Sequence, residues 1–491
     1  MDKQGIETAA PLSRDARIAV IGTGFGGIGM AVALLRRGFR NVRLFEREET
    51  IGGVWRDNVY PGAACDVPSR LYSFSFAPKR DWSHDYGRQE EILDYLKDVA
   101  ARYGVAERTS FSANLTRATW SGSGWTLGFD GHPATQADVL AFAVGQLSWP
   151  VIPDIEGLKE FEGEVFHSAR WPADFSADGK RIACVGTGAS AIQYVPRLAE
   201  RAAHLYVFQR SPTHILPKPD RPRRGRSALL DGIARRFERS LLRRTLDLRY
   251  GIMKPGSMMA KLAERQARRN LEKGVSDPAL REKLWPDYPI GCKRILLSDD
   301  FYPAMARPNV SLVTEGVRAL GPRHVETMPG DRVDCDAVIF GTGFASTQFL
   351  KGIEVFGRGD LPLSEVWAGG AAAYRGIQVP DFPNMFILYG PNTNLGHNSI
   401  VYMLEEQSRY VTRCLDEAVR RGAGWVDAPR SALAEDQRWK QTALARTSWA
   451  ADCGSWYKQA DGKITNNWPG AAGAYRAQLR ATSVRKLLYG A

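Results

Sequence analysis

The sequence has no apolar run that could cross a membrane, since no stretch approaches about 18 consecutive apolar residues. Its first residues, MDKQGIETAAPLSRDAR, contain no apolar core of a secretory signal, which favours a cytoplasmic protein. Cysteine is also sparse: six residues are scattered along 491, with no CxxC pair and no metal-type spacing. These absences predict reduced thiols and no metal site.

Acidic residues are fewer than basic ones, and the formal net charge is +12. Much of the excess lies between Arg221 and Arg249, where ten arginines face three acids. Such a run is typical of a solvated helix face, with weak contact to a membrane surface as the alternative. No nucleic-acid motif accompanies the charge, so nucleic acid is not predicted as a partner, and no feature specifies an oligomeric state.

What the sequence does contain is an internal repeat. RIAVIGTGFGG at residues 17–27 returns as RIACVGTGASA at residues 181–191. Each copy continues through a helix-like segment into a second apolar strand, VRLFER or LYVFQR. A glycine-rich turn inside a strand–turn–helix–strand unit is the fingerprint of dinucleotide binding. Two copies therefore predict an α/β protein with two Rossmann-like dinucleotide-binding domains.

The turn residues have separate physical roles. In the first copy Gly22 permits the tight turn, Gly24 lets a pyrophosphate approach the backbone, and Gly27 allows close helix–strand packing. In the second copy Gly186 and Gly188 take the first two roles. The phosphate would lie at the helix N-terminus. The adjacent turn residues are further candidates for cofactor contact: Phe25, Thr187, Ala189 and Ser190.

The ends of the second strands distinguish the two sites. Glu46 closes the second strand of the first unit, where a carboxylate can accept hydrogen bonds from a ribose 2′-hydroxyl. The matching positions of the second unit are Gln209 and Arg210. A carboxylate there would repel a 2′-phosphate, whereas a guanidinium attracts one. The first site therefore suits FAD or NAD, and the second suits NADP.

Two longer motifs carry a family resemblance. FEGEVFHSARWP at 161–172 resembles the F-x-G-x-x-x-H-x-x-x-W-P fingerprint of type I Baeyer–Villiger monooxygenases, which are class B flavoprotein monooxygenases. GGVWRDNVYPGAACD at 52–66 resembles a second pattern of that family, and YGPNTNLGHNS at 389–399 a weaker third. The fingerprint residues are Phe161, Gly163, His167, Trp171 and Pro172.

The resemblance implies FAD in the first site and NADPH in the second. The implied reaction converts a ketone to an ester or lactone with O2, through a C4a-peroxyflavin. Two alternatives remain open: an N- or S-oxygenating flavin-containing monooxygenase, and an NADPH-binding flavoprotein whose helical insertion docks a partner or a membrane. A flavin disulfide reductase is disfavoured, because the sequence has no redox-active cysteine pair.

The repeat and the resemblance together predict how the chain is divided. Residues 1–15 would be a disordered extension. The remaining segments would alternate between two domains: FAD-binding at 16–150 and 341–491, NADP-binding at 151–215 and 291–340, and a helical insertion in the NADP domain at 216–290.

The resemblance also assigns chemistry to particular residues. Arg294, in IGCKRILLSDDFYP, resembles the family arginine that lies over the flavin and would stabilise negative charge during the reaction. Asp66 is its expected partner, since a carboxylate offsets the desolvation of a buried guanidinium. Lys293 and Ser211 would help Arg210 to hold the NADP 2′-phosphate. Flavin contacts are expected from four further residues: Gly53, Val54, Trp55 and Tyr72.

The His–Trp end of the fingerprint is expected to lie in a linker between the two domains. There His167 would couple domain movement and Trp171 would pack at the interface. Direct proton transfer by His167 is the alternative.

Overall fold

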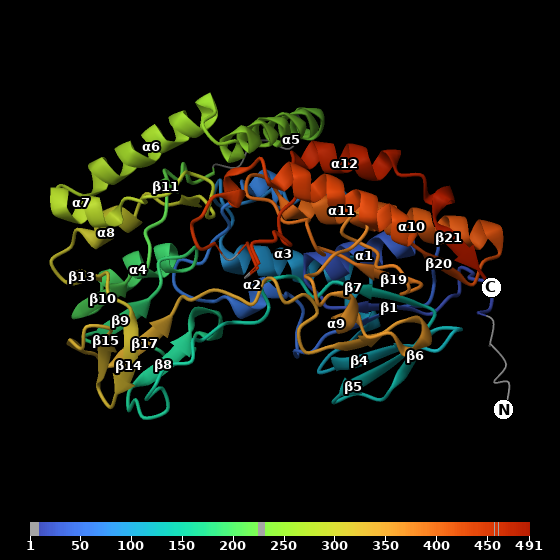
Figure 1. Cartoon of the computed structure of the whole chain (residues 1–491), viewed down its shortest axis with the longest axis horizontal. Coiled ribbons are helices and arrows are strands. Elements are labelled where there is room, and N and C mark those ends of the chain that lie inside the picture. The colour runs from blue at the N-terminus through green and yellow to red at the C-terminus, as the bar shows by residue number, and fades with distance from the viewer. Residues whose placement is uncertain (1–8, 224–230, 456, 460) are drawn as a thin grey trace.

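The computed structural model describes residues 9–223, 231–455, 457–459 and 461–491. Two lobes lie side by side, each built on a five-stranded parallel sheet (Figure 1). In order across the first sheet the strands are β19 (Met385–Ile387), β7 (Val139–Phe142), β1 (Ile18–Ile21), β2 (Val42–Phe45) and β3 (Thr109–Ser110). In order across the second they are β13 (Val310–Val313), β10 (His204–Phe208), β9 (Arg181–Val185), β17 (Ala337–Phe340) and β8 (Glu164–His167).

The two sheets repeat one topology. In each, the strand before the glycine turn lies between the second strand of its βαβ unit and a later apolar strand, which is β7 beside β1 and β17 beside β9. Every residue of β1, β7 and β17 is buried, as expected for central parallel strands covered on both faces. The predicted α/β fold with two Rossmann-like units is confirmed.

Smaller sheets complete both lobes. The first lobe carries a four-stranded sheet of β18 (Glu354–Phe356), β4 (Asn114–Trp120), β5 (Trp125–Asp130) and β6 (Thr135–Ala137), and a pair formed by β20 (Trp425–Asp427) and β21 (Leu488–Gly490). The second carries β14 (Val317–Gly321), β15 (His324–Thr327) and β16 (Arg332–Asp334), together with the parallel pair β11 (Ile215–Leu216) and β12 (Leu296–Leu297).

The helices divide between the lobes. The first lobe has α1 (Phe25–Arg36), α2 (Val54–Asp57), α3 (Gln89–Arg102), α9 (Leu363–Val366), α10 (Ile400–Arg421), α11 (Arg430–Leu444) and α12 (Ala472–Ala481). The second has α4 (Ala191–Ala199) and α8 (Phe301–Met305). Between β11 and β12 the chain inserts α5 (Asp231–Leu248), α6 (Met258–Gly274) and α7 (Pro278–Leu284). Among the described residues no helix is long and apolar enough to span a membrane.

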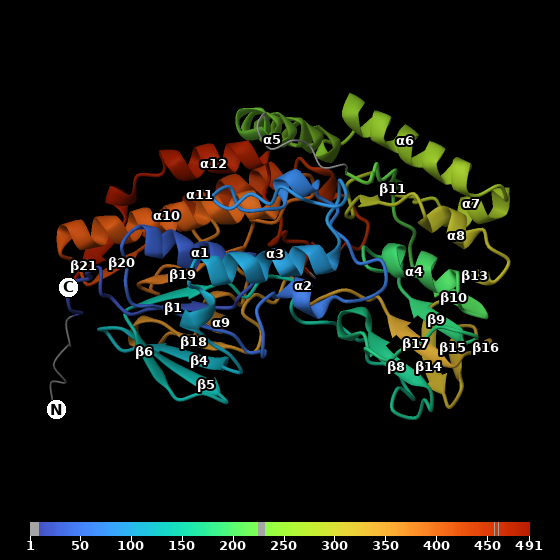
Figure 2. The same ribbon diagram turned by 180° about the vertical axis from the view of Figure 1, so that it is seen from behind.

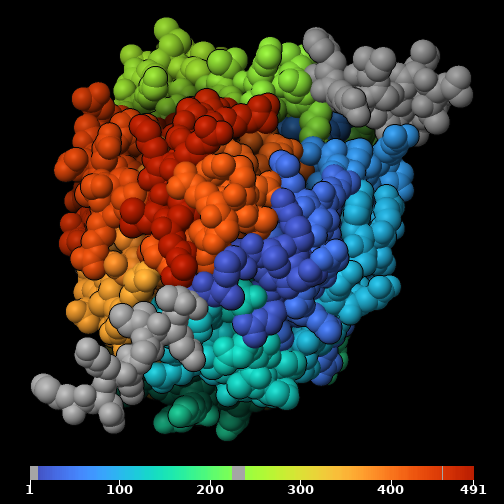
Figure 3. Space-filling model, turned by 90° about the vertical axis from the view of Figure 1, so that its right-hand side faces the viewer, coloured from blue at the N-terminus to red at the C-terminus, as the bar shows by residue number. Residues whose placement is uncertain are grey.

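The helical insertion runs over the top of both lobes (Figure 2). Its α5 reaches the first lobe, where Asp247 accepts hydrogen bonds from Ala472 N and Gly473 N at the start of α12, both at 3.0 Å. Its α6 packs instead against β11 and α8 of the second lobe. In the space-filling view the insertion lies directly on the C-terminal segments (Figure 3). The insertion therefore links the two halves.

The basic run within the insertion is not simply a solvated face. Arg239 donates to Arg70 O at 2.9 Å and to Ser73 O at 2.7 Å, and burial lowers the pKa of its guanidinium. Arg243 donates to Asp247 at 3.3 Å. Part of the predicted run, residues 224–230, lies outside the described residues. Arg239 therefore docks the insertion on the first lobe, whereas the Arg243–Asp247 pair lies within α5.

The prediction of a disordered N-terminal extension is wrong for residues 9–15, while residues 1–8 lie outside the description. Ala9 and Leu12 are buried, and Leu12 N donates to Ala423 O at 2.9 Å. Arg14 donates to Asp416 at 2.7 Å. Polar residues are frequent in residues 1–15, so the sequence did not indicate that two apolar side chains in this segment pack beside the end of α10.

Candidate active site

The two glycine turns have the same geometry. Gly22 has a φ of 101°, and a Cβ there would lie 2.7 Å from Ala143 O, just after β7. Gly186 has a φ of 107°, and a Cβ there would lie 2.6 Å from Gly341 O, just after β17. In both lobes the positive φ and the neighbouring strand end require glycine.

The second glycine of each turn is not explained by packing. A Cβ at Gly24 would come no closer than 3.8 Å to Gly53 Cα, and one at Gly188 no closer than 3.8 Å to Gly341 O. Protein atoms would thus tolerate a side chain at both positions. An approaching pyrophosphate would not, so the turns fit dinucleotides at the starts of α1 and α4. Thr187, Ala189 and Ser190 lie in the second turn, with Ser190 at the N-cap of α4.

The ends of the second strands differ as the sequence indicates. Glu46 is buried, and its Oε2 accepts hydrogen bonds from Thr23 N at 3.0 Å and Thr23 Oγ1 at 2.7 Å. The carboxylate thus braces the first glycine turn. Gln209 is also buried and donates to Lys283 O at 2.8 Å, so its amide is already engaged. Arg210 is exposed beside it.

A polar cavity of about 390 Å³ lies beside the end of β10. Lys293 Nζ donates to Ser211 Oγ at 2.5 Å and lies 4.7 Å from the ring centre of Tyr288. Burial, and then the nearby charge of Arg210, lower the pKa of Lys293. The lining residues are Ser211, Asp287, Tyr288, Pro289, Lys293, Ala451, Asp452, Cys453 and Gly454. The charges of Arg210 and Lys293 are thus close enough to repel each other, and the cavity wall also carries the carboxylates of Asp287 and Asp452.

Asp66 and Arg294 form an ion pair between the lobes. The Asp66 charge raises the pKa of Arg294 above its ordinary value, against the effect of burial. Burial alone would raise the pKa of Asp66, but the charge and hydrogen bond of Arg294 outweigh it and hold that pKa below its usual range. Both groups are therefore ionised throughout the physiological range, and the guanidinium is a permanent cation.

Three tyrosines that were not among the predicted site residues surround this ion pair. Tyr389 and Tyr457 lie close enough to influence Arg294, and Tyr60 is influenced by both Asp66 and Arg294. Burial raises the pKa of Tyr389 to about 12, so its phenol stays protonated. Its hydroxyl donates to Asn394 Oδ1 at 2.6 Å. Tyr389 begins the YGPNTN motif, which was a usable signal, whereas nothing in the sequence marks Tyr457.

The predicted flavin-contact residues gather at the first glycine turn. Trp55 Nε1 donates to Tyr72 OH at 3.1 Å, and the Tyr72 ring lies 5.0 Å from that of Phe25. A Cβ at Gly53 would lie 3.1 Å from Gly24 Cα, which brings Val54 and the start of α2 against the same turn. The aromatic cluster thus stands beside the first dinucleotide site.

Comparison with known proteins decides the family. A family model described as "Flavin-binding monooxygenase-like" matches residues 15–265. A Baeyer–Villiger monooxygenase of Streptomyces coelicolor is 40% identical over 470 residues, which cover 94% of this chain and 91% of that relative. The chain belongs to the Baeyer–Villiger monooxygenase family.

Solved structures agree with this membership. A closed crystal structure of cyclohexanone monooxygenase is 27% identical and superposes with a TM-score of 0.88, covering 98% of this chain and 100% of that one. A structure of OTEMO in complex with FAD and NADP is 27% identical, with a TM-score of 0.85 over 96% and 98% of the two chains. The protein is an FAD- and NADPH-dependent monooxygenase of the Baeyer–Villiger type, and the two predicted cofactors are confirmed.

Part of the family fingerprint forms a strand of the second sheet, so the expectation that His167 lies in a linker is wrong. Residues Glu164–His167 form edge strand β8, paired in parallel with β17. Phe161 is buried beside Phe208 and Phe340, and a Cβ at Gly163 would collide with Asp336 O. A strand of four residues is too short for its periodicity to be recognised in the sequence.

His167 and Trp171 pack within the second lobe. His167 is 1% exposed, its Nδ1 accepts from Ala169 N at 3.1 Å, and its Nε2 has no partner among the described residues. Burial lowers the pKa of His167 to about 4, so the ring is neutral at physiological pH. Trp171, followed by the half-buried Pro172, packs on Phe166 at 5.1 Å and Tyr194 at 5.6 Å.

Gln193, on α4, is an interdomain contact that the sequence did not reveal. Its amide Nε2 donates to Ala64 O at 3.0 Å, and its Oε1 accepts from Ala64 N and Tyr60 OH, both at 3.2 Å. Ala64 lies two residues before Asp66. The helix that begins at the second glycine turn therefore holds the loop that carries the Asp66 carboxylate.

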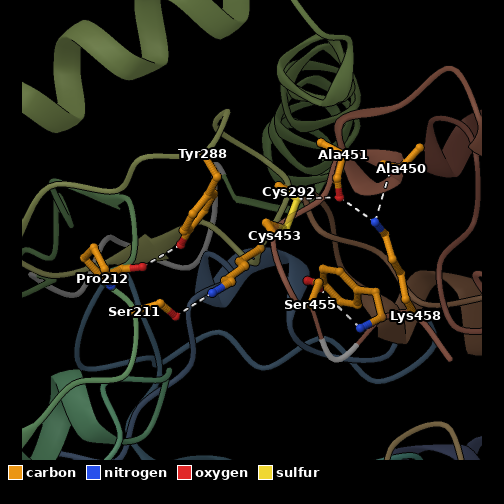
Figure 4. The surroundings of a disulfide bond; sticks show 11 residues. Ser211, Pro212, Tyr288, Cys292, Ala450, Ala451, Cys453, Ser455 and Lys458 are labelled. Atoms are coloured by element: carbon orange, nitrogen blue, oxygen red, sulfur yellow. Dashed lines mark hydrogen bonds between the residues drawn. A yellow bond between two sulfur atoms is a disulfide. The ribbon is translucent and has the colours of Figure 1, made fainter. Parts of the chain in front are cut away.

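The cysteines also differ from expectation. Cys292 and Cys453 form a disulfide, with Cα atoms 6.4 Å apart and a sequence separation of 161 (Figure 4). The other four cysteines are free and buried. Long separation gives no spacing signal, so the pair could not be predicted. No group of three or more potential metal ligands occurs within the described part of the chain.

Proposed function

We propose that the Asp66–Arg294 ion pair is the centre at which this monooxygenase inserts an oxygen atom beside the carbonyl carbon of a ketone. The single observation that supports this most strongly is a permanently charged guanidinium, held between the two lobes by a partly buried carboxylate. The overall reaction consumes a ketone, O2, NADPH and a proton, and it yields an ester or lactone, NADP⁺ and water. Bound FAD supplies the reduced ring that activates O2.

The protein's own residues stabilise charge and exclude water. Arg294 would face negative charge developing on the attacking oxygen and on the carbonyl oxygen, without giving up its own proton. Asp66 fixes the guanidinium in place, and the protonated phenols of Tyr389 and Tyr457 line it. Buried Tyr457, Trp449 and Ile290 share one apolar cluster close to this centre. Exclusion of water strengthens every charge interaction there.

We also propose which residues hold each cofactor. FAD would bind at Gly22, Gly24, Phe25, Gly27 and Glu46, with Gly53–Trp55 and Tyr72 beside it. NADPH would bind at residues 186–190, with its 2′-phosphate in the cavity lined by Ser211 and Lys293 beside Arg210. The cation pair and the unexplained openness at Gly24 and Gly188 support this division.

The matching domain division is a proposal as well. The FAD-binding domain would comprise residues 16–150 and 341–491, and the NADP-binding domain residues 151–215 and 291–340. Its support is that β19 joins the first sheet and β17 the second. We place the enzyme in the cytoplasm, where the NADPH pool lies. The four free cysteines fit a compartment that keeps thiols reduced, and the Cys292–Cys453 disulfide would be transient there.

The test is substitution of the guanidinium. In Arg294→Ala we expect ester formation to fall by about 100- to 1,000-fold, the usual cost of removing a stabilising donor, while bound flavin is retained. Arg294→Lys keeps the charge without the planar fork and should lose less. Arg201→Ala, which removes an exposed ion pair with Asp178, is the matched control and should behave as wild type. Wild-type ester formation by Arg294→Ala would refute the assignment.

Product analysis separates this function from N- or S-oxygenation. A panel of ketones and thioethers is incubated with NADPH and O2, and products are identified by mass spectrometry. The proposal expects ester or lactone from at least one ketone. Sulfoxide alone, with no ester from any ketone, would favour the rival chemistry instead.

A further inference from the structure

The Cys292–Cys453 bond joins two segments that each have hydrogen bonds of their own. On the NADP side, Tyr288 OH donates to Pro212 O at 2.6 Å and Lys293 donates to Ser211, so residues 288–293 are fixed to the end of β10 (Figure 4). On the other side, Lys458 Nζ donates to Ala450 O at 3.0 Å and also to Ala451 O. The disulfide is the covalent link between them.

The disulfide also forms part of the wall of the cavity assigned above to the 2′-phosphate. Cys453 lines that cavity together with Lys293 and Ser211, and Cys292 directly precedes Lys293. Asp287 and Asp452 line the same cavity, but both are exposed and their repulsion of an anion is screened by solvent. The bond therefore holds residues 451–454 across one side of the cavity.

The pair is built to exist in both oxidation states. Cys292 is fully buried, whereas Cys453 is half-buried and can be reached from solvent. The Sγ of Cys292 lies 3.2 Å from Ala451 O. A disulfide sulfur has no proton to donate to that carbonyl, but a thiol has one, so the reduced state finds a hydrogen-bond acceptor already in place.

We propose that Cys292 and Cys453 are a reversible oxidation site that controls how long NADP(H) stays bound. This rests on the assignment of the cavity to the 2′-phosphate. In the oxidised enzyme residues 451–454 are tied over the cavity and the nucleotide leaves slowly. In the reduced enzyme only the weak hydrogen bond from the Cys292 thiol to Ala451 O holds that wall, so the wall moves more easily and the nucleotide exchanges faster. A disulfide in a compartment of reduced thiols is characteristically transient and regulatory.

The chemistry balances with hydrogen peroxide as the oxidant. The Cys453 sulfur attacks one peroxide oxygen, the O–O bond breaks, and a sulfenic acid and one water result. The Cys292 sulfur then displaces the hydroxyl group, forming the S–S bond and a second water. Both thiol protons end in water, two sulfurs are oxidised and one peroxide is reduced. Reduction by a dithiol reverses the change, with attack at the accessible Cys453 sulfur.

The test uses the FAD-bound full chain, reduced with dithiothreitol or oxidised with hydrogen peroxide and then desalted. Peptide mapping without reductant identifies the Cys292–Cys453 cross-link. The dissociation constants and release rates of NADP⁺ and of adenosine 2′,5′-bisphosphate are then measured in both forms. We expect reduction to weaken both ligands about five- to tenfold, mainly through faster release. NAD⁺, which has no 2′-phosphate, should respond less.

Variants separate the site from general effects of oxidation. Cys453→Ser and Cys292→Ser should each bind NADP⁺ as the reduced enzyme does, whatever the treatment. Cys414→Ala, which removes a buried free thiol on α10, should keep the full response. Absence of the cross-link after oxidation, or equal NADP⁺ release from both forms, overturns the proposal.

A further variant distinguishes failure of the redox proposal from failure of the phosphate assignment. Lys293→Ala should weaken adenosine 2′,5′-bisphosphate in the oxidised enzyme. If it does not, the cavity is not the 2′-phosphate site and the redox proposal falls with that assignment. If it does, but oxidation leaves nucleotide release unchanged, the redox proposal alone is wrong.

Discussion

At the residue scale, the site depends on charges that do not change within the working pH range. Arg294 is held ionised by Asp66, and Asp66 by Arg294, so neither can serve as a proton shuttle. The same burial that strengthens their attraction keeps the phenol of Tyr389 protonated. On the proposed assignment the centre would stabilise charge rather than move protons.

His167, unlike the Asp66–Arg294 ion pair, is kept neutral by burial. Its pKa of about 4 in the folded protein lies below the ordinary value near 6.5, so below about pH 6.5 the unfolded chain binds a proton that the folded chain does not. The free energy of unfolding should therefore fall from pH 6.5 towards pH 4, by up to about 1.4 kcal/mol per pH unit from this residue.

The measurement compares denaturant unfolding of wild type and His167→Asn between those pH values. Asparagine can still accept the Ala169 N–H hydrogen bond, so the turn is preserved while the titratable group is removed. The stability difference between the two proteins should change steadily across this range. A difference that is constant with pH would show that His167 is not buried in its neutral form.

Some site residues could be predicted from the sequence and others could not, and the difference has physical reasons. Asp66 and Arg294 are 228 residues apart, and only their place within long family motifs suggested that they meet. Cys292 and Cys453 belong to no motif, so their pairing depends on tertiary packing alone. Tyr457 has the same limitation. The repeated glycine turns, in contrast, are local backbone requirements, and local requirements are visible in a sequence.

At the scale of elements, the two βαβ units were predictable and the fingerprint strand was not. In each βαβ unit, around β1 and around β9, the strands, the turn and the helix follow one another in the sequence. Each unit is therefore specified by local sequence. Strand β8 is specified by its partner β17, which lies about 170 residues further along the chain. The same non-local dependence explains the docking of residues 9–15 on α10.

Because the two units are equivalent, the same substitution in each glycine turn should affect a different cofactor. Gly22→Ala and Gly186→Ala each place a Cβ less than 3 Å from a backbone carbonyl at a positive φ, a strain of about 1–3 kcal/mol. We expect Gly22→Ala to lose FAD during purification. Gly186→Ala should keep FAD and bind NADP⁺ at least about tenfold more weakly, since 1.4 kcal/mol corresponds to that factor.

Gly38→Ala is the matched control for these two variants. Gly38 also has a positive φ, of 82°, but no atom lies within 4 Å of its Cβ position and it is in neither turn. Flavin absorbance and NADP⁺ titration are the measurements, and Gly38→Ala should retain both ligands. Loss of FAD from Gly186→Ala, with NADP⁺ binding intact, would reverse the assignment of the two sites.

At the scale of the whole molecule, several ties among the described residues cross between the halves, and three of them involve the residues of the site. The Asp66–Arg294 ion pair and the Cys292–Cys453 disulfide are two of them, and the helical insertion adds support from above. The third is the amide of Gln193, which grips the backbone of Ala64 with hydrogen bonds in both directions. It connects the helix after the second glycine turn to the loop of Asp66.

Loosening that third tie should uncouple NADPH oxidation from oxygen insertion. Gln193→Ala removes all three hydrogen bonds, so the Asp66 loop is less firmly placed against Arg294. Gln193→Glu can still accept from Ala64 N and Tyr60 OH but cannot donate to Ala64 O. The ester formed per NADPH oxidised should therefore decrease in the order wild type, Glu, Ala, by several-fold in the last, with flavin content unchanged. Each lost hydrogen bond costs about 1 kcal/mol of stability as well. Because a purely structural role would lower the unfolding midpoint and leave the product ratio at its wild-type value, that outcome would rule out coupling through Gln193.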